Sequence, residues 1–201
     1  MVLDEVRSTL FSAGLRRLLA ATLHPGERVL WQGQPDAFAD MMMWRFLWWI
    51  GFPWLALTAI AISRGWIDES ITFFLLSGVL MVTAPLVMAL YDMQTLCVIT
   101  DRRALIMRTA WGKRTVTGTL FKAMDATLEI LDVGRGAAHL NFTSGVSTRS
   151  PDADYTGRYG FRCIRDASDV QNILERARGA NVNRAGRTRR GCTGKRKTAR
   201  K

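Results

Sequence analysis

The sequence predicts an α+β protein with a membrane anchor: a two-helix transmembrane hairpin is joined to a small antiparallel β-sandwich or partly open barrel, which a C-terminal helix caps. Three observations predict this fold class. Two long, uncharged apolar stretches lie close together in the first half of the chain. Residues 92–178 then alternate between apolar and polar side chains in short runs, as β-strands do. An amphipathic helical pattern follows the last of these runs.

Residues 1–23 are predicted to form an amphipathic helix, because apolar side chains recur at every third or fourth position. Arg7, Arg16 and Arg17 interrupt the apolar run, so we expect no secretory signal peptide here. Two interpretations of the apolar face stay open. The helix either lies in the membrane interface, with Arg16 and Arg17 near the head groups, or packs on the folded domain.

Residues 24–40 are expected to contribute a strand to the folded domain ahead of the membrane hairpin. The run Glu27–Gly33 alternates, and a Pro-Gly pair and a further proline bound it. Leu30 is expected to point inwards. Trp31 is interpreted as a core residue rather than as part of an aromatic belt at the membrane surface.

Residues 41–91 are predicted to form the transmembrane hairpin, with spans at about residues 44–63 and 71–91. Ile71–Tyr91 holds 21 residues without a charge, and a helix of that length crosses about 30 Å, the hydrocarbon thickness of a bilayer. Phe46–Ile62 holds 17 uncharged residues, flanked by tryptophans of the kind found at membrane interfaces. The loop between the two stretches is so short that the helices must be antiparallel.

The distribution of basic residues predicts that both termini lie in the cytoplasm. The loop between the spans carries Arg64 against Asp68 and Glu69, whereas arginines flank the hairpin on both outer sides. Lys and Arg concentrate on the cytoplasmic side of membranes. In that reducing compartment, Cys97 and Cys163 are expected to be small buried hydrophobic residues rather than a disulfide.

Residues 92–178 are predicted to form the cytoplasmic β domain. Its expected strands are residues 95–100, 104–109, 114–119, 126–131, 138–142 and 158–164. The polar segment 143–157 is expected to be a loop. The capping helix should then begin near Asp166 or Ser168 and end at Gly179.

Three segments carry a resemblance to a known family. They read PGERVLWQGQP (Pro25–Pro35), LCVITDRRALI (Leu96–Ile106) and FRCIRDASDVQNIL (Phe161–Leu174). With two spans between the first and the second segment, the chain resembles bacterial membrane proteins that carry a pleckstrin-homology-like domain. The resemblance covers roughly residues 24–178. It implies a bent antiparallel sandwich capped by a C-terminal helix, the inner membrane of a bacterium as the location, and anchoring and binding rather than a reaction.

The turn Thr100–Arg103 is the best local candidate for a binding site. Asp101 can hydrogen-bond the backbone of its own turn, which leaves the guanidinium groups of Arg102 and Arg103 at a strand end that we expect close to the membrane. These groups either grip the phosphates of anionic lipid head groups or, as the sequence favours, hold the β-hairpin together. The residues that would extend a lipid-binding patch are Arg108, Lys113 and Arg114.

Residues 179–201 carry nine Lys or Arg and no acidic residue, and so supply most of the formal net charge of +11. We expect this tail to be disordered, because it lacks the apolar residues that build a core. It is interpreted as binding anionic lipid at the inner leaflet, as having no dedicated ligand or, least favoured because no aromatic side chain interleaves the charges, as binding nucleic acid. The basic residues singled out are Arg187, Arg189, Arg190, Lys195, Arg196 and Lys197.

No pattern in the sequence indicates catalytic chemistry. It has no nucleophile elbow, no Gly-rich phosphate loop and no zinc-type spacing of Cys and His, so we expect a non-enzymatic protein without cofactor or metal. The favoured function is a binding or scaffolding module that holds a membrane or cytoplasmic protein in a membrane complex. The alternatives are a sensor of anionic lipid and, less favoured because neither span contains an ionisable residue, a transport or channel element.

Overall fold

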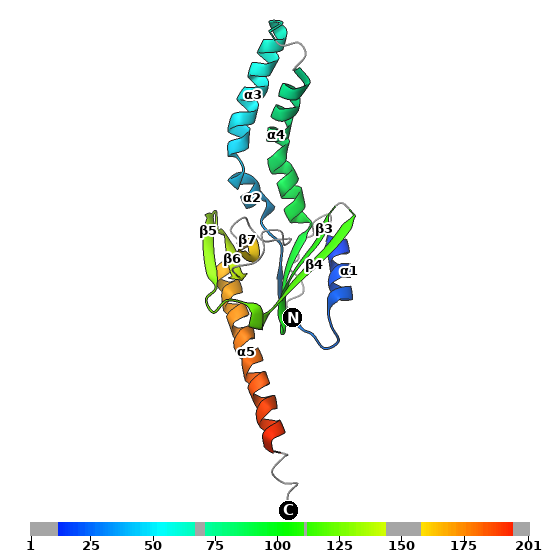
Figure 1. Cartoon of the computed structure of the whole chain (residues 1–201), viewed down its shortest axis with the longest axis vertical. Coiled ribbons are helices and arrows are strands. Elements are labelled where there is room, and N and C mark those ends of the chain that lie inside the picture. Colours follow the sequence, from blue (N-terminus) through cyan, green and yellow to red (C-terminus); the bar gives the residue numbers. More distant parts are fainter. Residues whose placement is uncertain (1–11, 67–70, 111, 144–157, 195–201) are drawn as a thin grey trace, which may run out of the picture.

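The computed structural model describes residues 12–66, 71–110, 112–143 and 158–194 and shows an α+β fold (Figure 1). The helices are α1 (Ser12–Thr22), α2 (Ala37–Met43), α3 (Phe46–Ser63), α4 (Ile71–Met93) and α5 (Ala167–Gly194), with a short 3₁₀ helix η1 (Phe121–Ala123). The strands are β1 (Val29–Gly33), β2 (Thr95–Thr100), β3 (Arg103–Ala110), β4 (Lys113–Leu120), β5 (Glu129–Gly134), β6 (Ala137–Thr143) and β7 (Tyr159–Arg165).

The strands form two antiparallel sheets, one in the order β1-β2-β3-β4 and the other in the order β5-β6-β7. The predicted strands are confirmed, although the strand expected at 126–131 begins three residues later, at Glu129. The facing surfaces of the sheets and the first turns of α5 enclose one apolar core. Its largest fully buried side chains include Phe142, Phe161, Ile99 and Leu174.

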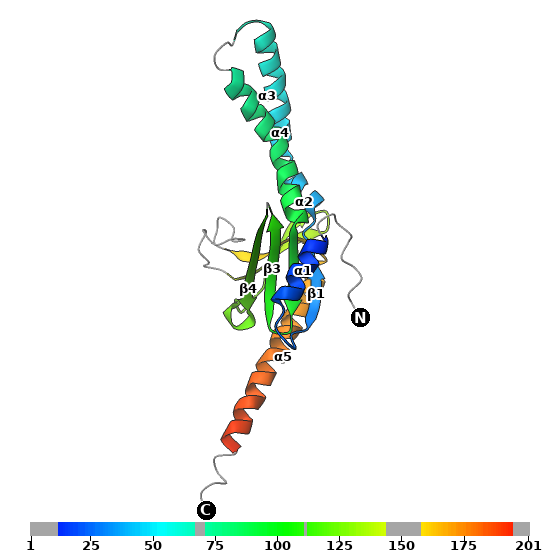
Figure 2. The same ribbon diagram turned by 90° about the vertical axis from the view of Figure 1, so that its right-hand side faces the viewer.

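The central strand β2 is buried along its whole length because both faces of its sheet are covered. Cys97 and Ile99 point into the core between the sheets, whereas Leu96 and Val98 point to the opposite face. On that opposite face they pack with Leu15 and Leu19 of α1, which crosses the four-stranded sheet in Figure 2. Of the two interpretations of the N-terminal helix, the structure therefore favours packing on the domain; residues 1–11 lie outside the described part of the chain.

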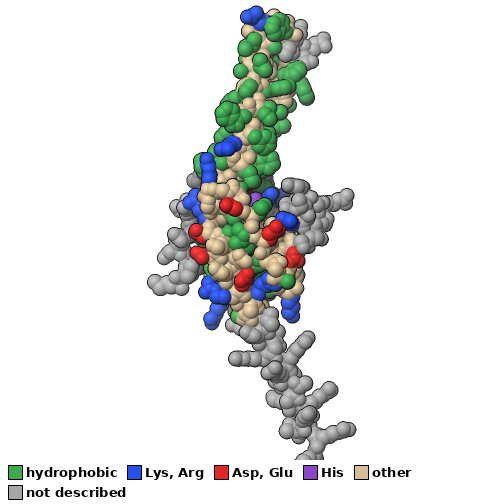
Figure 3. Space-filling view, turned by 90° about the vertical axis from the view of Figure 1, so that its left-hand side faces the viewer, with side chains coloured by type: hydrophobic (Ala, Val, Ile, Leu, Met, Phe, Trp, Pro, Cys, Tyr) green, Lys and Arg blue, Asp and Glu red, His purple; other side chains and the backbone are tan. Residues whose placement is uncertain are grey.

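Helices α3 and α4 form an antiparallel hairpin that projects from one end of the sheets (Figures 1 and 2). Both are long and apolar enough to cross a membrane. Only 11% of the apolar stretch of α3 and 17% of that of α4 is buried within the protein. The core helix of a soluble protein is mostly buried, whereas Trp49 and Leu76 here are 78% and 67% exposed. Figure 3 shows hydrophobic side chains along the length of the hairpin. Such an exposed apolar surface is compatible with a pair of membrane-spanning helices.

Two tryptophan indoles tie the helices of the hairpin to each other. Trp54 Nε1 donates a hydrogen bond to the carbonyl of Phe74 at 3.0 Å, and Trp48 Nε1 donates one to the carbonyl of Val82 at 2.9 Å. Gly78 permits this close approach, since a Cβ there would lie 2.5 Å from a leucine side chain of α3. Trp48 thus has an interhelical role that was not predicted from the sequence, where its position suggested the membrane interface.

The hairpin continues directly into the domain. Only Gln94 separates α4 from β2. On the other side of the hairpin, β1 leads to α3 through the short helix α2. Helix α2 was not predicted from the sequence. Asp36 caps the N-terminus of α2 by accepting hydrogen bonds from the amides of Phe38 and Ala39. The Arg165 guanidinium of β7 also bonds Asp36, so both sheets hold the hairpin.

Three expectations about orientation and extent need correction. Leu30 is 40% exposed rather than inward, because a bulge in the β1–β2 pairing lets Trp31 turn to the core, where its ring lies 5.7 Å from that of Phe161. Helix α5 does not end at Gly179 but continues to Gly194, so the predicted disorder is wrong up to that residue. The segment has four arginines and two alanines, which are good helix formers, and it has no proline to block the helix. Its glycines weaken the helix, by about 1 kcal/mol each, without ending it.

Candidate functional site

The basic residues predicted to form one patch lie at two opposite ends of the domain. β2 starts at the foot of the hairpin and runs away from it, so the turn at Asp101 and Arg102 lies at the far end. β3 returns to the hairpin, which brings Arg108, Lys113 and Arg114 to its foot. The eight residues of β3 span about 25 Å. The expectation that the Thr100–Arg103 turn lies close to the membrane end is therefore wrong.

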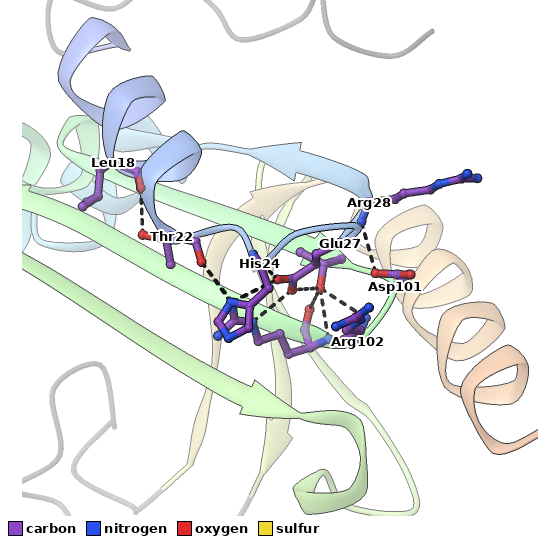
Figure 4. A network of polar contacts seen from close by, with 9 residues as sticks. Leu18, Thr22, His24, Glu27, Arg28, Asp101 and Arg102 are labelled. Carbon is purple, nitrogen blue, oxygen red and sulfur yellow. Dashed lines mark hydrogen bonds and ion pairs between the residues drawn. The ribbon is translucent and has the colours of Figure 1, made fainter. Parts of the chain in front are cut away.

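A polar network joins this turn to the segment before β1 (Figure 4), and Arg103 belongs to it. Its Nε and Nη2 atoms donate to the two carboxylate oxygens of Glu27 at 3.0 Å each. Nη2 also bonds the Thr22 carbonyl at 3.2 Å and lies 3.0 Å from Nδ1 of His24. The Arg103 guanidinium is thus engaged by protein groups, and these belong to the segment before β1 rather than to the β2–β3 hairpin itself.

Glu27 is the centre of the network, a role that was not predicted from the sequence. Its side chain is 1% exposed, and it accepts hydrogen bonds from Arg103, from the His24 amide and from the Thr100 hydroxyl at 2.7 Å. Burial alone would raise the pKa of this carboxyl, but the donated hydrogen bonds and the Arg103 charge outweigh it and lower the pKa to about 2. The available signal was the presence in one sequence of a Gly-Glu element before the hairpin and a Thr-Asp-Arg-Arg turn after it.

Thr100 and Asp101 hold the turn in place from two sides. The Thr100 hydroxyl accepts the amides of Arg102 and Arg103 at 3.2 and 3.1 Å. The Asp101 carboxylate accepts the amide of Arg28 at 3.1 Å, which fastens the turn to the start of β1. Arg102 itself is exposed, so of the two arginines of the turn it is the one whose side chain faces solvent.

The foot of the hairpin gathers a second set of cations. The Arg108 guanidinium lies 4.1 Å above the Tyr91 ring and donates to the Thr95 hydroxyl at 3.0 Å, which links β3 to the end of α4. Lys113 and Arg114, in the strand that pairs with β3, are exposed. Arg45 is exposed at the start of α3.

Arg135 joins this set from the turn between β5 and β6. It occupies the β5–β6 turn with a positive φ of 59°, and its guanidinium lies 5.3 Å from the Phe38 ring of α2. We name Arg45, Lys113, Arg114 and Arg135 the foot cations. All four lie at the end of the domain from which the hairpin leaves.

A groove of about 460 Å³ lies beside the foot of the hairpin. The open edge of β1, the start of α2 and the end of β7 line it, with Trp31, Phe38 and Ile164 among its apolar side chains. Exposed strand edges of this kind can pair with an extended segment of another protein.

Cys163, His139 and Asp40 come together behind this groove. The Cys163 amide donates to His139 Nδ1 at 3.0 Å, and the Cys163 thiol lies 3.6 Å from Asp40 Oδ1. Burial, with the Asp40 charge beside it, raises the pKa of the thiol well above its ordinary value, which opposes the thiolate that nucleophilic cysteines need. Cys97 and Cys163 are both buried thiols, as predicted.

The described residues contain no group of three or more His, Cys, Asp or Glu that is placed to hold a metal ion. The basic residues Lys195, Arg196 and Lys197 lie outside the described part of the chain. Arg187, Arg189 and Arg190 lie in the part of α5 that extends beyond the domain.

The Glu27–Arg103 network predicts different effects for two adjacent arginines. Arg103→Ala leaves Glu27 buried without its cation, so we expect a loss of about 3–5 kcal/mol in the free energy of unfolding. Arg102→Ala, the matched control, removes an exposed side chain and should change it by about 0.5 kcal/mol or less. Chemical denaturation of the purified proteins in detergent measures both values. Equal losses in the two variants would show that the network does not stabilise the fold.

The lowered pKa of Glu27 predicts a dependence of stability on acid. Because the folded pKa of about 2 lies below the ordinary 4.5, the stabilisation is complete above pH 4.5 and is lost as the pH falls towards 2. A difference of this size corresponds to about 3 kcal/mol. The free energy of unfolding of the wild type, measured from neutral pH to pH 2.5, should fall more steeply than that of Glu27→Gln. Parallel curves would contradict the assignment.

Comparison of the chain with protein-family models, with curated proteins and with solved structures finds no match. The likeness to pleckstrin-homology-like membrane proteins therefore stays a prediction from the sequence motifs. The structural features that bear on function are the hairpin, the foot cations and the Thr100–Arg103 turn.

Proposed function

We propose that the chain is a non-enzymatic, membrane-anchored binding module. Its α3–α4 hairpin crosses the inner membrane of a bacterium, and its β domain holds a protein partner on the cytoplasmic side. The observation that carries the proposal is the insertion of an exposed apolar hairpin between β1 and β2, which are paired neighbours in one sheet. Such an anchor fixes the domain at the membrane surface in one orientation.

The strand arrangement supports a pleckstrin-homology-like domain. Four antiparallel strands face three, and a helix follows the last strand and packs into the core between the sheets. Two segments that carry the resemblance, around Glu27 and around Arg103, bond to each other. Their joint presence then has a physical reason, because each supplies half of one buried ion pair.

The groove at the open edge of β1 supports a scaffolding role. It combines apolar side chains with the free backbone groups of an edge strand, which is the combination that strand addition uses. It also lies next to the hairpin foot, so a partner bound there would be held close to the membrane. A membrane-bound or peripheral protein with an extended segment fits this position.

The proposed topology predicts which sites a membrane-impermeant maleimide reaches. In a background with Cys192→Ser, where the remaining native cysteines are buried, Arg64→Cys should be labelled in spheroplasts because it follows α3 at the tip of the hairpin. Lys122→Cys, exposed at the far end of the domain, should be labelled only after lysis. Labelling of Lys122→Cys in intact spheroplasts, or recovery of the protein in the soluble fraction after carbonate extraction, would overturn the proposal.

Anionic lipid is the second candidate ligand, and the foot cations favour it over the Thr100–Arg103 turn. With the hairpin in the bilayer, Arg45, Lys113, Arg114 and Arg135 lie at the level of the head groups. Basic residues at that level attract anionic lipid by about 1 kcal/mol each.

The lipid candidate predicts a difference between two variants with equal loss of charge. Replacing the four foot cations by Gln should reduce the anionic lipid retained by the detergent-purified protein, as native mass spectrometry measures it. The same substitutions at Arg28, Arg102, Lys122 and Arg176, at the opposite end, should leave it unchanged. An equal reduction in both variants would mean that net charge, not a site at the foot, attracts the lipid.

A further inference from the structure

The end of the domain opposite the hairpin, which we call the distal pole, is basic and carries α5 away from the membrane. Its exposed cations are Arg28, Arg102, Lys122 and Arg176. Its acidic groups include the buried Glu27, which is paired with Arg103, and Asp101, which accepts the Arg28 amide. They also include Asp125 and Glu175, and Glu175 accepts the side-chain amide of Gln171. Figure 3 shows Lys and Arg side chains gathered at this end of the folded body.

Helix α5 leaves the domain at this pole. The Asn181 side-chain amide donates to the Asp101 carbonyl at 3.3 Å, which sets the helix beside the β2–β3 turn, and the helix continues from there to Gly194. Figures 1 and 2 show that it points away from the hairpin in both views. From Gly179 onwards the sequence adds nine basic residues and no acid.

We propose that the distal pole and the α5 extension bind the phosphate backbone of nucleic acid without regard to sequence. The inference rests on the membrane anchoring proposed above, because that anchoring decides which polyanion the tail can reach. It also reverses the order of preference drawn from the sequence, which assumed a tail lying close to the inner leaflet.

The end of α5 lies too far from the hairpin foot for the extension to bind lipid of its own membrane. β2 spans about 20 Å from the hairpin foot to the distal pole, and the 14 residues from Asn181 to Gly194 add about 20 Å of helix. Charges in physiological salt are screened over about 8 Å. The end of α5 therefore lies several screening lengths from the head groups of its own membrane.

The composition of the extension favours nucleic acid over an acidic protein. Residues 179–201 contain no aromatic residue and no Leu, Ile or Met, whereas protein interfaces rely on such side chains as buried anchors. Binding to a phosphate backbone needs cations alone. The same lack of aromatic side chains argues for a duplex rather than for single strands, which bind by base stacking.

The test uses the full-length protein in nanodiscs of zwitterionic lipid and a fluorescent duplex DNA of random sequence, with duplex RNA as a second probe. An extension variant carries Arg184→Gln, Arg187→Gln, Arg189→Gln and Arg190→Gln. The control is the variant with the four foot cations replaced by Gln, which loses the same charge. Anisotropy titrations between about 50 and 200 mM salt give the affinity and its salt dependence.

We expect the wild type to lose affinity steeply with salt and the extension variant to bind at least about tenfold more weakly. The slope of log affinity against log salt should fall by about 0.9 for each phosphate that the variant no longer neutralises. The foot variant should bind as the wild type does. A chain ending at Arg178 gives the same result if the substitutions disturb α5.

Duplex binding that is absent at low salt, equal in both variants, or matched by binding of a polyglutamate peptide would overturn the proposal. Failure of membrane anchoring appears separately, in the maleimide labelling.

Discussion

The insertion of the hairpin between two paired strands is the constraint on which the rest of the structure depends. β1 and β2 are antiparallel neighbours, so the chain leaves and re-enters the sheet at one end. Only Gln94 lies between α4 and β2, so the strand follows the helix almost without a break. The direction of each strand then decides where the turn that follows it lies. A strand that runs towards the foot ends in a turn at the hairpin end, and a strand that runs away from the foot ends in a turn at the distal pole.

At the opposite end of the β1–β2 pair, an ion pair holds the two strands together, because no direct chain connection joins them there. Glu27 and Arg103 are far apart in the sequence, and their ion pair fastens the start of β1 to the β2–β3 turn. A buried carboxylate is costly unless it is fully bonded, and Glu27 receives donors from an arginine, a hydroxyl and a backbone amide. The covalent link at the foot and the ion pair at the pole together hold the edge strand in register.

Much of the fold could be predicted because it follows from local patterns. The uncharged stretches located α3 and α4, and alternation located the strands to within a few residues. The predictions that were wrong or missing concern features that depend on contacts between distant segments of the chain. The position of Arg102 and Arg103 needed the direction of β2, and the role of Glu27 needed a partner found 76 residues away. Arg135 became a foot cation only because β5 and β6 bring their turn to α2. No single-sequence pattern contains these distances.

Anchoring also limits how copies of the chain can associate. β4 is an exposed edge strand, and such edges often pair with their own kind. Antiparallel pairing of two β4 edges requires the strands to run in opposite directions. Under the proposed anchoring, however, both copies direct β4 away from the same membrane. The pairing would place the two hairpins at opposite ends of the joined sheet, so one bilayer cannot accept both. The anchor therefore protects an edge that Lys113 and Arg114 already mark with charge.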